Sequence, residues 1–270
     1  MAKSTRGGKA GSSSFTTIPT FAAAAQPAAQ PAPQPQPAPQ PVVQPVPQPV
    51  ISADYDAFKK MTDDQKADAI TQAAKTPVPV FLAQNDLQKV LYGLKLNDKP
   101  TLVDDSVLDT LPGKELFRTV NATSNQQYRM KFTATDIAQQ TIRGTVTRVS
   151  DTGGSVHGRG IYFADSYRDS IAYGNRAGNA SQTAVVRVKL SPTAKTISTH
   201  AAATGVASEI ASGSKLGKAL AKIGGTDRTA VWSLAKGYDA MVAGNGYHVV
   251  INRSALVASK TINAMGSSWK

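Results

Sequence analysis

Three side chains with hydroxyl groups follow a pair of glycines in the middle of the chain, and their spacing indicates a binding site for a flat polar ring. Gly158 and Gly160 lack a Cβ, so the backbone can turn sharply there and a flat ligand can approach it closely. Tyr162 follows them, and Ser170 and Tyr173 are three residues apart, so on a helix these two share a face. Two tyrosines and a serine around a glycine-lined slot suit a flat ring that carries an amide, such as nicotinamide.

A strand and a short helix must position these side chains. Residues 161–164 prefer the β conformation, which predicts a strand that delivers Tyr162. Asp165 or Ser166 is suited to cap a helix that starts directly after this strand. We therefore expect a strand, a turn and a helix to bring the tyrosines and the serine to one place.

The run Gly158-Arg-Gly-Ile-Tyr-Phe-Ala-Asp165, continued by Ser170 and Tyr173, resembles the nicotinamide-pocket motif of the ADP-ribosyltransferase superfamily. The resemblance is strongest to its poly(ADP-ribose) polymerase-like branch, and it covers about sixteen residues with the internal spacing preserved. It implies that Tyr162, Ser170 and Tyr173 hold nicotinamide, with help from backbone groups near the glycines. It also implies that NAD is the co-substrate and that the fold is a pair of split antiparallel β-sheets.

A second motif, Leu116-Phe-Arg118-Thr-Val, precedes the glycine pair by about forty residues. It resembles the Leu-Tyr-Arg pattern of the superfamily's arginine-type branch more than the Trp-His-Gly pattern of the polymerase-like branch. The resemblance implies that Arg118 holds the adenosine-side ribose or the pyrophosphate of NAD. The fixed fork of a guanidinium can bind such oxygens in a bidentate manner. Taken alone, an arginine at the end of a strand is more typical of a surface ion pair, and the glycine-framed motif downstream is what favours the binding role.

The third motif of the superfamily is usually a Glu at the start of a late strand. Its carboxylate stabilises the oxocarbenium ion that develops as nicotinamide leaves. This chain has only two glutamates, Glu115 and Glu209, and neither fits. In the segment Gly246-Tyr-His-Val-Val-Ile-Asn252, which resembles the closing region of the family, the position of the Glu holds Tyr247, and His248 follows it.

The missing Glu leaves three interpretations open. Asp239, at the end of the preceding Gly-Tyr-Asp segment, is the nearest acid in the sequence and a candidate for the charge-stabilising role. Alternatively, a loop supplies Asp151 or Asp165, or the site binds NAD or ADP-ribose without turnover. His157 lies just before the glycines, where it is a candidate to contact a phosphate or to act as an acid, or is simply a polar loop residue.

Composition excludes several other kinds of site. The 270 residues include no cysteine, so disulfides, thiolate metal sites and a Cys nucleophile are excluded. The three histidines are scattered, and we expect no metal site. No apolar run approaches the roughly 20 residues of a membrane span, so we expect a soluble protein. The chain also lacks a Gly-x-Gly-x-x-Gly after a strand and a P-loop, so the expected NAD site is not of the Rossmann type.

Charge is unevenly distributed. Residues 137–270 carry 16 Lys and Arg against 6 Asp and Glu, and the whole chain has a formal charge of +12. A basic half suits an anionic ligand, either a nucleic acid or a dinucleotide with its pyrophosphate. It is also consistent with a surface that only confers solubility.

Three parts follow from composition and periodicity. Residues 1–50 hold 11 of the 16 prolines and a basic head without acids, which predicts a disordered tail and a Pro/Gln-rich spacer. Residues 51–111 show helical periodicity and predict a helical lobe. Residues 112–270 interleave strands and short helices, which predicts an α+β domain with a largely antiparallel sheet, the ADP-ribosyltransferase-like part of the chain.

Individual elements are predicted by period. A helix is expected over Tyr55–Ala74, with a cap near Thr62 that splits it into two. The other expected helices are Leu82–Leu94, Asp105–Leu111, Ala203–Ile223 (helical or mixed) and Thr229–Lys236. The expected strands, besides the one at 161–164, are Glu115–Val120, Gln127–Phe132, Thr141–Val149, Thr183–Leu190, Ala194–Ser198, Tyr247–Asn252 and Ala258–Ile262.

These features predict a mono-ADP-ribosyltransferase that moves ADP-ribose from NAD to a protein side chain and releases nicotinamide. The basic head, the Pro/Gln spacer and the cysteine-free domain also resemble proteins that tailed phages carry in the virion. That resemblance implies delivery into the cytoplasm of a bacterial host, a host protein as target, and packaged DNA as a partner of the basic tail. A protein of the bacterial cytoplasm or a secreted effector is equally consistent. The alternatives are a catalytically inactive NAD-binding or structural, DNA-associated virion protein with the same fold, and a transferase that acts on nucleic acid.

Overall fold

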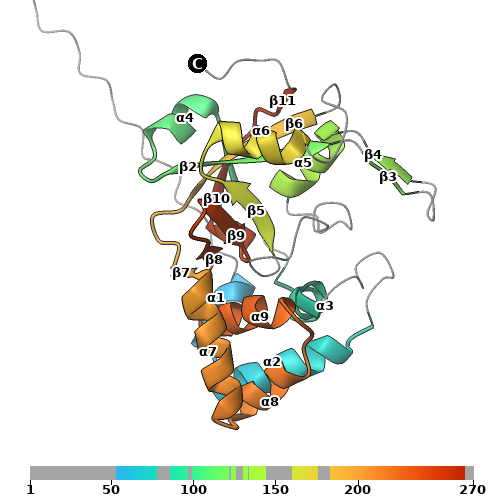
Figure 1. Ribbon diagram of the computed structural model, residues 1–270, viewed down its shortest axis with the longest axis vertical. Helices are drawn as coiled ribbons and strands as arrows, with labels where there is room; N and C mark the ends of the chain where they lie inside the picture. The colour runs from blue at the N-terminus through green and yellow to red at the C-terminus, as the bar shows by residue number, and fades with distance from the viewer. Residues whose placement is uncertain are drawn as a thin grey trace, which may run out of the picture. The chain divides into compact units, whose positions relative to one another are not determined.

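The computed structural model contains a mixed β-sheet with helices packed around it (Figure 1). The described residues are 53–77, 86–96, 99–121, 123–125, 130–132, 134–143, 160–175 and 183–264. They belong to one unit, Pro45–Lys270. The predicted tail and spacer, residues 1–50, lie outside the described residues. The predicted combination of helices with a largely antiparallel sheet is confirmed.

Nine strands of the described residues form the main sheet, in the order β1-β10-β6-β2-β5-β9-β8-β7, with β11 also paired to β6. Only the outermost pairs, β1 with β10 and β7 with β8, are parallel. A second sheet contains only β3 and β4. In chain order the strands are β1 Thr101–Val103, β2 Glu115–Asn121, β3 Thr123–Asn125, β4 Met130–Phe132, β5 Ile161–Ala164, β6 Thr183–Leu190, β7 Thr196–Ser198, β8 Ala240–Val242, β9 Tyr247–Val250, β10 Leu256–Ser259 and β11 Asn263–Ala264.

The two halves of the main sheet are joined by very few residues. β2 pairs with β6 over seven residues, and β5 pairs with β9 over four. Between β2 and β5 the register contains one pair, Phe117 with Ala164. The expected pair of split sheets is therefore a single continuous sheet whose halves diverge beyond one point of contact.

Two helices cover opposite faces of this junction. Side chains alternate along a strand, so neighbours on β2 face opposite sides. α5 (Ala134–Arg143) packs on the face of Leu116 and Val120, where its residues Ala134 and Ala138 are buried. α6 (Tyr167–Asn175) lies on the other face, that of Phe117 and Thr119, where the rings of Tyr167 and Phe117 form a T-shaped pair and Ser170 contacts Thr119. The central strands are thereby held from both sides.

One predicted strand is wrong in its described part. Residues 141–143 of the expected strand Thr141–Val149 belong to helix α5, and residues 144–149 lie outside the described residues. Ala134 and Ala138 are one helical turn apart and both are buried against β2 and β6. Contact with the sheet therefore favours a helix here, against the local alternation.

A helical layer packs against the β8–β9 end of the sheet (Figure 1). Its core combines helices from both ends of the described chain with Met241 of β8 and Val249 of β9. The predicted helical lobe 51–111 is thus only part of this layer, because β1 of the same segment is a strand of the main sheet and α4 packs against β10. The helices of the layer are α1 Ala53–Lys60, α2 Asp63–Lys75, α3 Asp86–Gly93, α7 Thr199–Ala211, α8 Lys215–Ala221 and α9 Asp227–Ala235, and the helix beside β10 is α4 Asp105–Thr110.

The break between α1 and α2 lies where the sequence predicted a cap. Thr62 has extended backbone angles, and its side chain accepts a hydrogen bond from the backbone N–H of Gln65. The Gln65 side chain in turn accepts one from the backbone N–H of Thr62, which completes a capping box. The predicted division of the first helix is confirmed.

Candidate functional site

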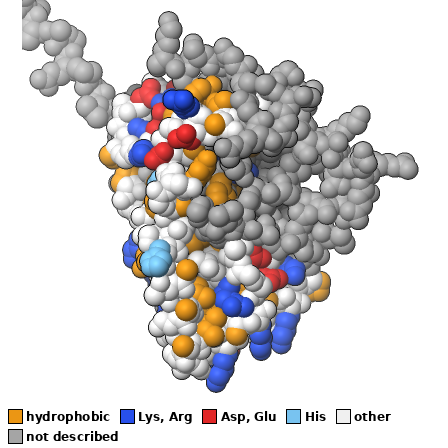
Figure 2. Space-filling view, in the orientation of Figure 1, with side chains coloured by type: hydrophobic (Ala, Val, Ile, Leu, Met, Phe, Trp, Pro, Cys, Tyr) orange, Lys and Arg blue, Asp and Glu red, His pale blue; other side chains and the backbone are white. Residues whose placement is uncertain are grey.

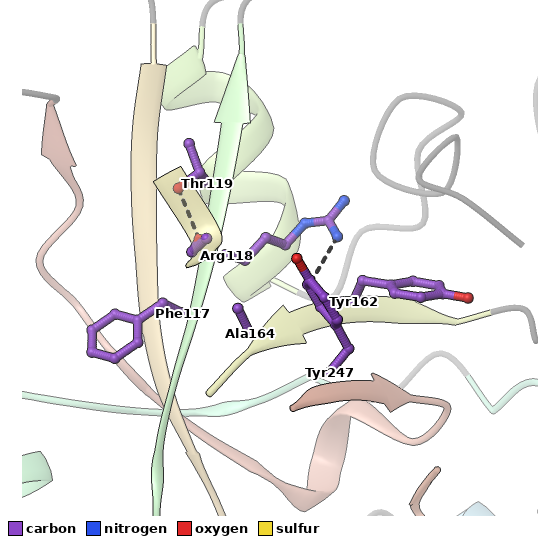
Figure 3. A pocket seen from close by; sticks show the side chains of 7 residues that line it. Phe117, Arg118, Thr119, Tyr162, Ala164 and Tyr247 are labelled. Atoms are coloured by element: carbon purple, nitrogen blue, oxygen red, sulfur yellow. Dashed lines mark hydrogen bonds between the residues drawn. The ribbon is translucent and has the colours of Figure 1, made fainter. Parts of the chain in front are cut away.

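A small pocket opens where β2 and β5 diverge (Figure 3). It has a volume of about 370 Å³ when the solvent at its mouth is included. Four of the residues that line it, from β2, β5, α6 and β9, are the sequence-predicted Arg118, Tyr162, Ser170 and Tyr247. The remaining three lining residues are Phe117, Thr119 and Ala164. The structure thus brings together side chains that are up to 130 positions apart in the sequence.

Arg118 spans the gap between the two halves of the sheet. Its Nη1 donates a hydrogen bond of 3.0 Å to the backbone carbonyl of Tyr162. Phe117 and Arg118 leave β2 on opposite sides in Figure 3, and the guanidinium of Arg118 lies over β5. β2 does not pair with β5 at Tyr162, so the Tyr162 carbonyl accepts its hydrogen bond from the Arg118 side chain. This contact places a permanent positive charge at the wall of the pocket.

Ser170 reaches the pocket from α6 and is 4% exposed. The helix begins where the sequence predicted, because the Ser166 hydroxyl accepts a hydrogen bond of 3.0 Å from the backbone N–H of Asp169. This start places Ser170 over β2, where its Oγ lies 2.8 Å from the Oγ1 of Thr119. Two hydroxyl groups thus share one wall of the pocket.

Tyr162 and Tyr247 form another wall. Tyr247 is the register partner of Ala164, and Tyr162 is the partner of Val249, so all four side chains share one face of the β5–β9 pair. Tyr162 also packs against the core of the helical layer. In Figure 3 the phenol of Tyr247 extends toward the side of the pocket that Arg118 occupies.

Gly160 has a role other than the one the sequence suggested. Its φ is +153°, and a Cβ built there would lie 2.7 Å from both the Val249 Cγ1 and the Val250 carbonyl oxygen. The missing side chain is therefore required for the close approach of β5 to β9. Tyr173 is in α6, three residues beyond Ser170. The side chain of Tyr173, and all of Gly158, His157 and Asp151, lie outside the described residues.

Asp239 is not brought to the pocket. Its backbone lies at the opposite end of β9 from Tyr247, where its carbonyl accepts hydrogen bonds from the backbone N–H groups of Ile251 and Asn252. The carboxylate is 3% exposed and forms an ion pair of 3.0 Å with Lys59 of α1. It therefore ties the helical layer to the sheet, and the arrangement gives no support to the catalytic role that its sequence position suggested.

Asp165 follows the pocket residue Ala164 but is already engaged. Its carboxylate forms an ion pair of 2.5 Å with Lys114, and its backbone N–H donates to the carbonyl of Gly246. A Cβ built on Gly246 would lie 2.7 Å from this carboxylate, so the glycine makes room for it. Burial lowers the pKa of the neighbouring His248, and the charge of Lys114 adds to this effect while that of Asp165 opposes it.

The described lining of the pocket contains one cation, three hydroxyl-bearing side chains besides Thr119, and no carboxylate. Such a set can hold an amide-bearing ring and a negative group, but it offers no acid or base with a carboxyl group. Sequence reasoning missed Phe117 and Thr119 as lining residues. Their positions next to Arg118 on a predicted strand could have indicated them. Because β2 diverges from β5, consecutive residues of β2 face the pocket.

Basic side chains are exposed over the helical layer (Figure 2). Lys215 and Lys218 of α8 and its C-cap Lys222 are exposed, and Lys215 pairs with Asp68 at 2.5 Å. Within the described ranges, no group of His, Asp and Glu is arranged to hold a metal ion. The helices of those ranges are too short or too polar to serve as membrane spans.

Comparison of the chain with protein-family models, with curated proteins and with solved structures found no match.

Proposed function

We propose that this protein is an NAD-dependent mono-ADP-ribosyltransferase of the ADP-ribosyltransferase fold, with its site at the junction of β2 and β5. The observation that carries the proposal is the convergence of Arg118, Tyr162, Ser170 and Tyr247 on one pocket. These four residues come from three sequence motifs, each of which resembles a motif of that superfamily. A chance resemblance in three separate segments would give no reason for them to meet.

In the proposed reaction, the pocket holds the nicotinamide end of NAD. The Ser170 hydroxyl binds the carboxamide, and Tyr162 provides an aromatic wall. Arg118, the cation of the pocket, binds a negatively charged oxygen of the pyrophosphate. The bond between the ribose C1′ and the ring nitrogen breaks with both electrons passing to nitrogen, so nicotinamide leaves as a neutral molecule. A nucleophilic side chain of the target then bonds to C1′ and loses its proton to solvent.

Catalysis would be weaker than in relatives that carry the usual Glu. A preorganised charge opposite a developing oxocarbenium ion is often worth about 3 kcal/mol, which corresponds to roughly a hundredfold in rate. The described lining contains no Asp or Glu, and Asp165, the residue after the lining residue Ala164, is paired with Lys114. The same observation favours a second candidate function, an inactive domain that binds NAD without turnover.

The test is release of free nicotinamide from NAD by the full chain, with labelled NAD and a bacterial lysate present to reveal acceptors. Arg118→Lys and Ser170→Ala should each lower release at least tenfold per folded molecule. Arg228→Lys is the matched control, because Arg228 also donates to backbone carbonyls, at the end of α8 and away from the pocket. The Arg228→Lys variant should release nicotinamide at the same rate as the unaltered chain.

The outcomes separate the candidates. Label on protein with the unaltered chain supports the transferase, and label on nucleic acid moves the proposal to a transferase of that substrate class. Stabilisation by NAD without any nicotinamide release supports the inactive binder, since a ligand at 100 times its Kd stabilises a fold by about 2.7 kcal/mol. If NAD neither stabilises the protein nor is cleaved to release nicotinamide, both candidates are refuted.

Delivery by a phage particle and a host-protein target are part of the same proposal. They rest on the resemblance of segment 1–50, which lies outside the described residues, and on the basic C-terminal half. Detection of the chain in purified virions would support them.

A further inference from the structure

Thr119 and Ser170 form a pair of hydroxyl groups at the wall of the pocket. Their oxygens are 2.8 Å apart, and either atom can be the donor in the hydrogen bond between them. Both residues line the pocket, and Ser170 is 4% exposed. Thr119 was not a candidate from the sequence.

The pair has two hydroxyl hydrogens, whichever of the two oxygens is the donor in the mutual hydrogen bond. Each hydroxyl has one donor hydrogen and two acceptor lone pairs. The mutual hydrogen bond uses one of the two hydrogens. A ligand therefore meets one remaining O–H donor together with unused lone pairs on the neighbouring oxygen.

A primary carboxamide matches this arrangement. Its carbonyl oxygen accepts from the remaining O–H, and its NH₂ donates to a lone pair of the other hydroxyl. A carboxylate presents two acceptors and no donor, so one of its oxygens would face an oxygen lone pair across a largely buried contact. Failure to pair such a group is costly where water is excluded.

We propose that the Thr119–Ser170 pair selects a carboxamide over a carboxylate at this pocket, with Thr119 as a specificity-determining residue. The identity of the ring, nicotinamide, rests on the proposed function. The selection rests on the hydroxyl pair. The preferred ligand is thus nicotinamide or the nicotinamide end of NAD, and the disfavoured ligands are nicotinate and its dinucleotide.

Thr119→Val isolates the effect, because valine has nearly the same shape as threonine and no hydroxyl. The variant keeps the Ser170 O–H for an acceptor but removes the lone pairs that accept the amide N–H. Thr119→Ser keeps both features. The charge of Arg118 attracts carboxylates in all of these proteins, so it cancels when the ratio of the two affinities is compared between variants.

The experiment is an NMR titration of the full-length unaltered chain, Thr119→Val and Thr119→Ser with nicotinamide and with nicotinate. The ratio of nicotinamide affinity to nicotinate affinity should fall about tenfold in Thr119→Val, as expected for one neutral hydrogen bond lost and one repulsion relieved. It should stay within about twofold in Thr119→Ser. Ser170→Ala provides a second variant, with a similar fall, if Thr119→Val does not fold.

An unchanged ratio in folded Thr119→Val and Ser170→Ala would overturn the inference, as would the absence of nicotinamide binding by the unaltered chain. Failure of the proposed function looks different. In that case nicotinamide binds with the expected ratios, but the protein releases none from NAD.

Discussion

Replacement of Asp239 by Asn should destabilise the fold without removing the proposed release of nicotinamide from NAD. Both carboxylate oxygens of Asp239 accept hydrogen bonds. Oδ1 accepts from Lys59 Nζ at 3.0 Å and from Asn252 Nδ2 at 2.7 Å, while Oδ2 accepts from the backbone N–H of Lys195 at 2.8 Å. An asparagine has one oxygen and one NH₂ in the same shape. Whichever way it is turned, its NH₂ must face at least one of these donors.

The magnitude follows from the two losses. A charge-assisted hydrogen bond in a buried site is worth about 2 kcal/mol, and a buried donor left without an acceptor costs about 1–3 kcal/mol. Asp239→Asn should therefore lower the free energy of unfolding by about 4 kcal/mol, in the range found for a broken buried ion pair. For a unit of this size that corresponds to a fall in Tm of roughly 10 °C.

The assay is urea unfolding followed by far-ultraviolet circular dichroism, with nicotinamide release measured at a temperature where the variant is folded. Asp68→Asn is the control, because Asp68 also pairs with a lysine but its side chain is 65% exposed. Its cost should be below about 1 kcal/mol. If Asp239→Asn unfolds like the unaltered chain and loses nicotinamide release, Asp239 is catalytic after all and the structural argument is refuted.

Three further changes test other parts of the structure. Gly160→Ala should cost about 3 kcal/mol of unfolding free energy and abolish nicotinamide binding, since a Cβ with that φ collides with β9; a fully stable variant in urea unfolding would contradict the packing argument. Burial holds the pKa of His248 below its ordinary 6.5, so the unfolded chain takes up the proton first and the free energy of unfolding decreases as the pH falls below 6.5. The free energy of unfolding of His248→Asn should decrease less between pH 7.5 and 5.5 than that of the unaltered chain, and identical pH profiles would refute this. Thr62→Ala should remove the capping box of α2 at a cost of about 1 kcal/mol, seen as a Tm lowered by about 3 °C, whereas no shift would mean that the cap is not needed.

Local order was largely predictable from the sequence. Two strands, 161–164 and 183–190, have the bounds that were predicted for them. The first helix is divided at Thr62 by the predicted cap. Each is governed by interactions among residues close in sequence, such as β-branched side chains or a cap and its N3 partner. Residues 141–143 were misjudged because burial of Ala134 and Ala138 against the sheet, a contact distant in sequence, decides their conformation.

The motifs also predicted four of the residues that meet at the pocket, because the spacing between Tyr162 and Ser170 reflects a local strand, turn and helix. Asp239 shows the limit of this reasoning. It is eight residues before Tyr247, yet the hairpin from β8 to β9 carries it to the opposite end of the strand pair, where Lys59 neutralises it. Proximity in sequence is therefore a poor guide to which acid reaches a site.

The sequence by itself identified the side chains that we propose to bind an amide-bearing ring, and it determined the short elements that present them, because hydroxyl chemistry, caps and β preference are local properties. Only the tertiary structure decided that β2 and β5 share a single residue pair, so that Arg118 must bridge them and a pocket opens beside it. It also decided that Thr119 meets Ser170 and that Asp165 meets Lys114. Such pairings depend on the divergence of strands and the seating of α6, which arise from packing across the whole sheet and leave no local pattern in the chain.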